Sequence, residues 1–366
     1  MTESWKQTLP IVDVLTTLTW AEGTADLALW RATYESVLEA RLHTRLATND
    51  DYACIVQALD LLPPATRQRF LRAPAVSSLL LQGDERGDIE AGLLATLVMA
   101  ELAARGSIGN GAEPTWTARG GRVGGLMLPP GSLESAGPER LLAGTEIVLD
   151  VASPFVFPDD EFGIEHTVIY GPTELRAVEE RLLAAVEILR ALPAALPFAE
   201  TFIEVLAMRR ELKETVAFYT SSFSGLIGLS RFTNAHVGSV DTALLAEGLL
   251  HESTHGMLYL YEEVTGPFVL EPEANRIAVT SPWTGATIRL QSLVHACAVW
   301  YGTYWFLQRA LDCGLVSTDR SFQRMEMARL GFRRRPVTSA LAVHAPLLTP
   351  SIFEFLGEIE DAMRAV

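Results

Sequence analysis

The stretch "DTALLAEGLLHESTHGMLYLYEEVTG", residues 241–266, combines the pattern of a long helix with two histidines four residues apart. Its apolar residues recur at helical spacing, Asp241 is a typical N-cap, and Gly266 is typical of the position just beyond a helix. We therefore predict one helix across the stretch. Residues four apart share a helix face, so His251 and His255 can direct their imidazoles at one metal ion.

The residue after the first histidine completes an HExxH pattern. Glu252 is rotated by one position from His251, so its carboxylate would lie beside a bound ion rather than on it. In zinc peptidases this is the place of the general base that acts on metal-bound water. Neutral imidazole binds zinc, iron, nickel and copper, so the two histidines do not identify the metal.

A third ligand is required, and two known arrangements are poor matches. Leu258 and Tyr261 occupy the glycine and third-histidine positions of the pattern HExxHxxGxxH, which excludes that class. Glu271 and Glu273 lie at about the distance where other zinc peptidases have a glutamate ligand. They fall in a proline-containing turn rather than on a helix, which weakens them as candidates.

A distant histidine is the preferred third ligand. Glu262 and Glu263 are on the motif helix but two turns beyond His255, so we do not expect them to bind the same ion. His295 lies in another helical pattern, and a site with two histidines still requires a partner. The loop-associated His166 and His236 are weaker candidates.

The remainder of the chain is helical, then strand-rich, then helical again. This segregation predicts an α+β fold, mainly helical, with a small mixed or antiparallel sheet beside a zincin-like HExxH helix. We expect a helical N-terminal accessory region over 1–105, a Gly/Pro-rich connection over 106–140, and a metal-binding catalytic domain over 141–366.

Individual elements of the catalytic domain can be predicted from periodicity and from Gly and Pro. The expected helices, besides the motif helix, are 172–192, 290–314, 319–332 and 350–364. The expected strands are 144–157, a pair within 214–232 hinged at Ser224 and Gly225, and 267–272 with 276–282 as two short strands or a hairpin.

Composition limits the setting of the protein. The 366 residues carry a formal net charge of −16, which opposes binding to nucleic acid and to anionic membranes. No apolar run reaches the roughly 18 residues needed to span a bilayer, and the N-terminus does not resemble a signal peptide. Three scattered cysteines predict neither a disulfide framework nor a Cys-rich zinc site, so a cytoplasmic protein is expected.

Three segments together resemble a known family. They are "SSFSGLIGLSRF" (221–232), "LAEGLLHESTHGML" (245–258) and "SPWTGATIRLQSLVHACAVW" (281–300). The chain is similar, from about Trp116 to about Gln308, to HExxH-motif proteins associated with ribosomally synthesised, post-translationally modified peptides. That resemblance implies an iron(II)- and 2-oxoglutarate-dependent oxygenase that uses O₂ to hydroxylate a side-chain β-carbon of a precursor peptide.

The resemblance also implies roles for particular residues. His251, His255 and His295 would be the iron ligands, and Glu252 would be a nearby carboxylate that orients groups at the site. Arg289 would bind the far carboxylate of 2-oxoglutarate, for which a planar, permanently charged guanidinium is well suited.

Two further expectations concern the cosubstrate and the peptide. Ser281 could assist Arg289 with a hydroxyl group, although Ser-Pro more often begins a turn. Ser222 and Ser224 could line a substrate groove if their segment is an edge strand that pairs with an extended peptide. The same segment is equally compatible with a simple core strand.

Two alternative functions remain open on the sequence. One is a zinc metallopeptidase with Glu252 as general base and Glu271 or Glu273 as third ligand. The other is a non-catalytic peptide-binding protein whose HExxH motif is vestigial.

Overall fold

The structure is a computed structural model that forms two compact units, each assembled from distant segments of the chain. It describes residues 11–23, 26–46, 51–81, 87–106, 115–123, 139–151, 153, 170–209, 227–271, 274, 276–316 and 318–366. The first unit contains Met1–Leu27, Ala184–Ala199 and Asp241–Val366. The second contains Ala28–Leu183 and Glu200–Val240. The predicted division at 105 and 140 follows composition along the chain and stays a prediction.

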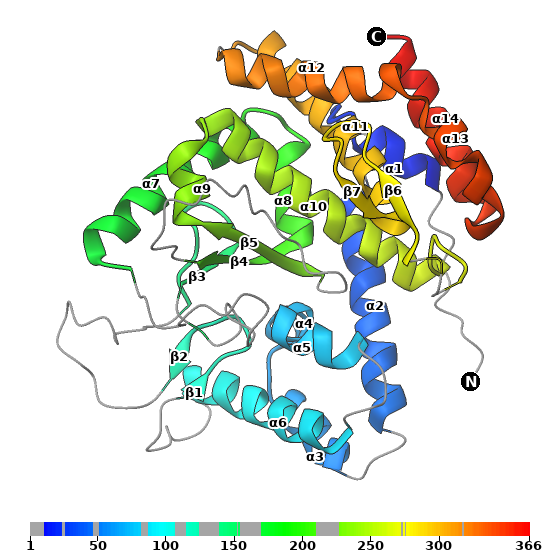
Figure 1. Ribbon diagram of the computed structural model, residues 1–366. Coiled ribbons are helices and arrows are strands. Elements are labelled where there is room, and N and C mark those ends of the chain that lie inside the picture. Colours follow the sequence, from blue (N-terminus) through cyan, green and yellow to red (C-terminus); the bar gives the residue numbers. More distant parts are fainter. Residues whose placement is uncertain are drawn as a thin grey trace. The chain divides into compact units, whose positions relative to one another are not determined.

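Long packed helices dominate the first unit. The helix α11 packs against α10, α12 and α14, and α1 packs against α14 (Figure 1). The elements are α1 (Ile11–Thr17), α10 (Thr242–Thr265), β6 (Ala278–Thr280), β7 (Thr287–Arg289), α11 (Leu290–Asp312), α12 (Asp319–Arg334), α13 (Val337–Leu341), the 3₁₀ helix η2 (Ala342–Leu347) and α14 (Pro350–Arg364).

The motif helix α10 begins and ends where its sequence predicts. The Asp241 carboxylate accepts a hydrogen bond from the Leu244 backbone N–H at 2.9 Å, which satisfies one of the free donors of the first turn. Gly266 follows the last turn with φ of 103°, a conformation that favours glycine. The helices predicted over 290–314, 319–332 and 350–364 are confirmed as α11, α12 and α14.

The hairpin before α11 differs from the predicted one. Ala278–Thr280 pairs antiparallel with Thr287–Arg289, whereas 267–272 contributes only a single bridge from Val269 to Leu348. The physical reason is the turn between them, because Gly285 has φ of 71° and Ser281 accepts its backbone N–H. Of the two predicted alternatives, the hairpin between 267–272 and 276–282 is therefore wrong, whereas 276–282 does contain a short strand, β6.

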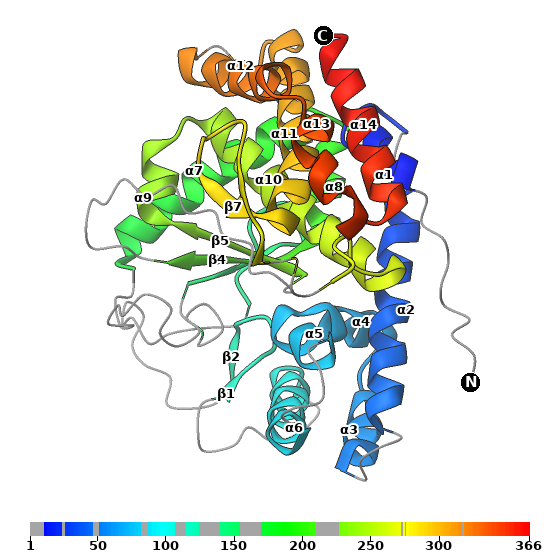
Figure 2. The same ribbon diagram turned by 45° about the vertical axis from the view of Figure 1, so that its right-hand side comes forward.

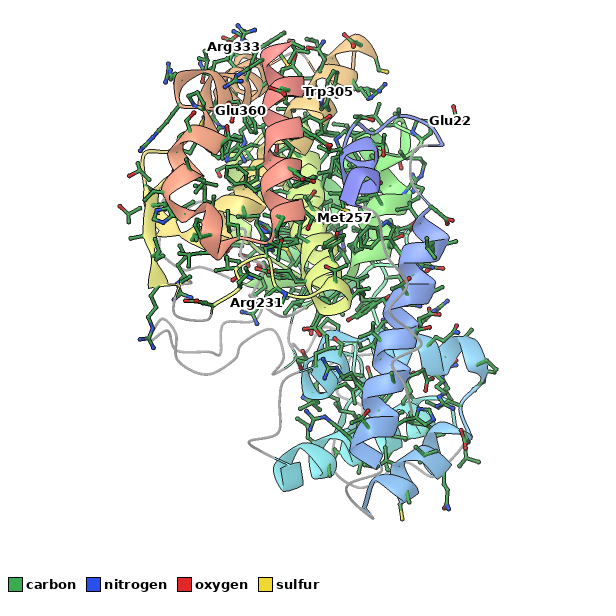
Figure 3. All side chains as sticks on the ribbon, turned by 90° about the vertical axis from the view of Figure 1, so that its right-hand side faces the viewer. Glu22, Arg231, Met257, Trp305, Arg333 and Glu360 are labelled. Carbon is green, nitrogen blue, oxygen red and sulfur yellow. The ribbon has the colours of Figure 1, made fainter. Side chains whose placement is uncertain are left out.

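Side chains fill the first unit densely (Figure 3). Met257 of α10 is fully buried, whereas Arg333 is exposed near the end of α12. Glu360 of α14 is also buried, and its carboxylate accepts hydrogen bonds from Thr338 and Arg364. A buried carboxylate with such partners ties α13 to α14.

The second unit combines helices with a small parallel sheet. In it α6 packs against α3, α5 and the β1–β2 hairpin. Three helices, α2, α7 and α8, contain residues of both units. With these three, the elements are α2 (Leu27–Leu46), α3 (Asp51–Leu59), α4 (Pro64–Arg72), α5 (Pro74–Leu81), α6 (Gly87–Ala104), β1 (Thr115–Trp116), β2 (Arg122–Val123), β3 (Val148–Asp150), α7 (Pro172–Arg190), α8 (Ala195–Phe202), β4 (Ile203–Arg209), β5 (Gly228–Thr233) and α9 (Asn234–Ser239).

The three-stranded sheet has the order β3–β4–β5, and both pairings are parallel. Parallel neighbours require long connections, and α7 and α8 lie in the one between β3 and β4. Four buried residues of these strands, Val148, Val205, Ala207 and Leu229, form a small apolar cluster. The central strand β4 was not predicted from the sequence. Of the predicted strand pair within 214–232, only β5 falls among the described residues.

Buried charges link α2 and α4 to the strand β4 in the second unit. Arg72 of α4 donates hydrogen bonds to Glu204 of β4 and Glu35 of α2, and Arg119 lies 3.6 Å from Glu204. Burial would lower the pKa of Arg72, but the two carboxylates more than reverse this, so the pKa is raised. A paired, permanently charged guanidinium is the form in which such a group can be buried.

The predicted α+β, mainly helical class is confirmed. The largest described sheet is parallel, and antiparallel pairing occurs in the two-stranded β1–β2 and β6–β7 sheets. None of the helices in the described ranges combines the length and apolar character needed to cross a membrane.

Candidate metal centre

One face of α10 carries a row of polar and aromatic side chains. Glu247, His251, His255 and Tyr259 follow one another at intervals of four residues, and Glu262 is three residues further. Intervals of three and four keep side chains on the same face of a helix. The two motif histidines therefore have a carboxylate before them and a tyrosine and a second carboxylate after them.

The facing helix α11 runs antiparallel to α10, and the two lie side by side (Figures 1 and 2). Gln291, near its start, contacts Glu262, near the end of α10. Thr303, two residues beyond its middle, contacts Glu247 near the start of α10. His295 lies between these contacts and so falls opposite the centre of the row on α10.

His255 and His295 approach each other at the distance expected of two ligands. Their Nδ1 atoms are 3.2 Å apart, and their rings are 23° from parallel with centroids 5.5 Å apart. His295 is buried and His255 is partly buried. Burial, with smaller contributions from His251 and His295, holds the pKa of His255 well below its usual value. Its imidazole is therefore neutral at pH 7, which is the form that binds metals.

His251 lies beside this pair but is turned differently. Its ring centroid is 5.1 Å from that of His255, at 60° between the ring planes. Its Nδ1 is 3.8 Å from Glu247 Oε1, and its Nε2 is 4.0 Å from Glu252 Oε1. Both distances are too long for hydrogen bonds, so the ring is not fixed by either carboxylate.

Glu262 has a role that its sequence position did not predict. We expected it to lie too far along α10 to share the ion, but its Oε2 is 3.0 Å from Nε2 of His295. It is thus a hydrogen-bond partner of a candidate ligand rather than a ligand itself. Its spacing of seven residues from His255, a multiple of the helical repeat, was the available signal.

Glu247 occupies a comparable position behind His251. Its Oε1 accepts a hydrogen bond from Thr303 at 2.5 Å and one from Arg324 at 3.2 Å. Burial alone would raise the pKa of Glu247, but Arg324, His251 and Thr303 together hold it well below its ordinary value. The site therefore contains an ionised carboxylate at this end, fixed by two other helices.

Aromatic side chains surround His295. The ring of Tyr259 lies 4.8 Å from the imidazole, and the ring of Phe268 meets it edge-on at 5.7 Å. Phe268 is fully buried and Tyr259 is partly buried. Such walls reduce the access of water and strengthen electrostatic interactions at the imidazole.

The other predicted site residues are placed as follows. Glu252 is buried on α10, with only 3% of its surface exposed. Arg289 is exposed and stands at the N-cap of α11 without a side-chain capping bond. Ser281 is buried, and its hydroxyl accepts the Thr284 backbone N–H at 3.3 Å within the β6–β7 turn. The cosubstrate roles of Arg289 and Ser281 stay predictions.

Trp283, also part of the family-like segment, has a packing role. Its indole stacks on Trp300, donates to the Ala328 carbonyl at 3.0 Å, and lies against Gly331 of α12. The turn of the hairpin is thereby anchored to α11 and α12.

Several candidates fall elsewhere. Ser222, Ser224, Glu273 and His166 lie outside the described residues. Glu271 is exposed beyond the end of α10, and His236 is in α9 of the other unit. Within the described ranges, no group of three or more His, Cys, Asp or Glu side chains is already arranged to hold a metal ion.

Comparison with known proteins adds no assignment. The chain matches no family model, and no curated protein is similar to it over a significant stretch.

Proposed function

We propose that this protein is an iron(II)- and 2-oxoglutarate-dependent oxygenase that hydroxylates a side-chain β-carbon of a ribosomal precursor peptide. The observation that carries the metal site is the approach of His255 Nδ1 to His295 Nδ1 at 3.2 Å, with His251 on the adjacent turn. The choice of reaction rests on the resemblance of three segments to HExxH peptide hydroxylases.

The donor set is compatible with one metal ion. Two nitrogens that are each about 2.1 Å from an ion lie roughly 3.0–3.4 Å apart when they subtend about 90–110° at it. The separation of 3.2 Å falls within that interval. His251 would complete the set through a change of side-chain rotamer, which its long distances to Glu247 and Glu252 permit.

Each residue then has a distinct task. His251, His255 and His295 hold the iron on one side, and Arg289 pairs with the far carboxylate of 2-oxoglutarate. Glu252 is the carboxylate beside the ligands that orients groups at the site. Tyr259 and Phe268 limit the access of water. Iron(II) with 2-oxoglutarate supplies the activation of O₂ that hydroxylation of an unactivated carbon requires.

The first prediction tests this function directly. Anaerobically prepared protein, given iron(II), ascorbate, 2-oxoglutarate and a precursor peptide encoded in the same gene cluster, should form succinate and add one oxygen to the peptide on exposure to air. His255→Ala should abolish both products because a ligand is lost. His43→Ala, which alters an exposed histidine of the other unit, is the control and should be fully active.

Absence of succinate from protein that retains its iron would contradict the oxygenase proposal. A zinc peptidase remains the second candidate because Glu252 is buried next to His251, where a general base belongs. Peptide cleavage that is lost in Glu252→Gln and does not depend on 2-oxoglutarate would favour the peptidase. Sub-stoichiometric iron and zinc would instead favour a binding protein with a vestigial motif.

A further inference from the structure

We propose that Glu262 is a positioning residue that selects the tautomer of His295 and so leaves Nδ1 as the metal-binding atom. The inference rests on the proposed metal site, but its main readout is independent of metal binding and of activity. It concerns where one proton is held on one imidazole.

Four hydrogen-bond contacts define the environment of the Glu262 carboxylate. Gln291 Nε2 donates to Oε1 at 3.1 Å and to Oε2 at 3.0 Å. The Phe268 backbone N–H donates to Oε1 at 3.0 Å. His295 Nε2 lies 3.0 Å from Oε2. Both oxygens of this carboxylate accept backbone or amide N–H groups, so it acts as an acceptor, and the nitrogen of His295 that faces it is the donor that carries the proton.

The position of that proton decides what the other nitrogen can do. Neutral imidazole has one N–H and one lone pair, so protonation at Nε2 places the lone pair on Nδ1. Nδ1 is the atom that faces His255, 3.2 Å from its Nδ1. A carboxylate bonded to the far nitrogen is the usual way in which proteins fix the tautomer and ring orientation of a metal-binding histidine.

Burial makes this contact decisive. The side chains of His295 and Glu262 are 2% and 10% exposed, so water is a poor competitor for either group. Gln291 lies four residues before His295 on the same face of α11 and donates to both oxygens of the carboxylate. The Glu262 carboxylate therefore links the end of α10 to two residues near the start of α11.

The informative variant is Glu262→Gln, which keeps the size and shape of the side chain. Its amide oxygen would accept the N–H groups of Gln291 and Phe268, which turns its NH₂ group toward His295 Nε2. An NH₂ donor requires a lone pair at Nε2, so the proton moves to Nδ1 and blocks the proposed ligand atom. We expect the ¹⁵N spectrum of histidine-labelled, metal-free protein at fixed pH to show His295 changing from the Nε2–H to the Nδ1–H form.

Metal affinity provides the second readout, with Zn²⁺ alone as the probe. Glu262→Gln should weaken binding by about 10–100-fold, at least as strongly as Glu262→Ala. Glu354→Gln, on the exposed side of α14, is the matched control and should bind like the original protein. Gln291→Ala removes a link between the helices but leaves the carboxylate facing His295, so it should retain the Nε2–H tautomer.

If Glu262 only links the two helices, the variants should rank differently in tautomer, affinity and stability. Glu262→Gln would then keep the tautomer and the affinity, and only Glu262→Ala and Gln291→Ala would lose stability. That result, or an Nδ1–H form in the original protein, overturns the inference. Failure of the original protein to bind Zn²⁺ or iron would overturn the proposed metal site instead, and the tautomer measurement would still decide the role of Glu262.

Discussion

At the scale of single residues, the candidate centre depends on what lies behind each imidazole. Glu262 contacts the far nitrogen of His295, and Glu247 lies on the Nδ1 side of His251. A carboxylate that is hydrogen-bonded to the far nitrogen of a histidine raises its basicity and limits its rotation, as Glu262 does for His295. Glu247 is 3.8 Å from His251, which is too far for such a bond. The closer contact to His295 explains why this ring is already directed at His255, whereas His251 is not.

A residue-scale prediction concerns Gly331, where a Cβ atom would lie 2.1 Å from the Trp283 ring. Gly331→Ala should destabilise the protein by about 1–3 kcal/mol, because the indole is stacked on Trp300 and bonded to Ala328 and cannot move without losing these contacts. Urea denaturation of the original protein and the variant measures the difference in the free energy of unfolding.

Gly357→Ala is the control for that measurement. This glycine is also inside a helix, but its Cβ would meet only Thr338, at 4.0 Å. Alanine there should stabilise the protein by up to about 1 kcal/mol because of its higher helix propensity. Equal effects of the two substitutions would show that Trp283 does not pack on Gly331 as described.

The sequence identifies some site residues better than others. His251 and His255 follow from spacing within one helix, and His295 follows from the need for a third ligand. Glu262 was excluded as a metal ligand because it lies two turns beyond His255 on α10. Its partner is on α11, and a contact between helices depends on packing that helical spacing does not describe.

At the scale of elements, the capping residue Asp241 and the terminal Gly266 predict where α10 begins and ends. Asp241 caps α10 and also accepts a 2.7 Å hydrogen bond from Thr318, the residue that caps α12. One carboxylate thereby fixes the start of the motif helix relative to a helix of the same unit.

Asp241→Ala should lower the free energy of unfolding by about 1 kcal/mol or more, because both contacts are lost. Thermal denaturation with a two-state fit measures the effect. Asp241→Asn retains an acceptor and should lose less. Thr349→Ala is a stringent control, since Thr349 precedes α14 without a capping hydrogen bond and should change little. A comparable loss at both positions would mean that capping does not explain the stability of α10.

Short strands were the least predictable elements. The strand β4 (Ile203–Arg209) follows α8 without an intervening turn, so no Gly or Pro marks its start. The strands of the β6–β7 hairpin have three residues each, which is too few for alternation of apolar and polar residues to be distinctive. Their pairing is determined by the turn at Gly285 and the packing of Trp283.

At the scale of the whole molecule, composition predicted the class but not the assembly of the units. Helices separated from strands along the chain indicate α+β, and this is what the described residues form. The first unit nevertheless joins Met1–Leu27 and Ala184–Ala199 to the C-terminal part. Contacts such as that of Trp20 with the Gly302 carbonyl connect residues 282 positions apart, which local periodicity cannot reveal.

Metal analysis of anaerobically purified protein, together with the variants His251→Ala, His255→Ala and His295→Ala, is the most direct test of the candidate centre. We predict one iron per chain in the original protein and a large loss of iron in each of the three variants. Full retention of iron in His295→Ala, in protein that remains folded, would contradict a centre built from both α10 and α11.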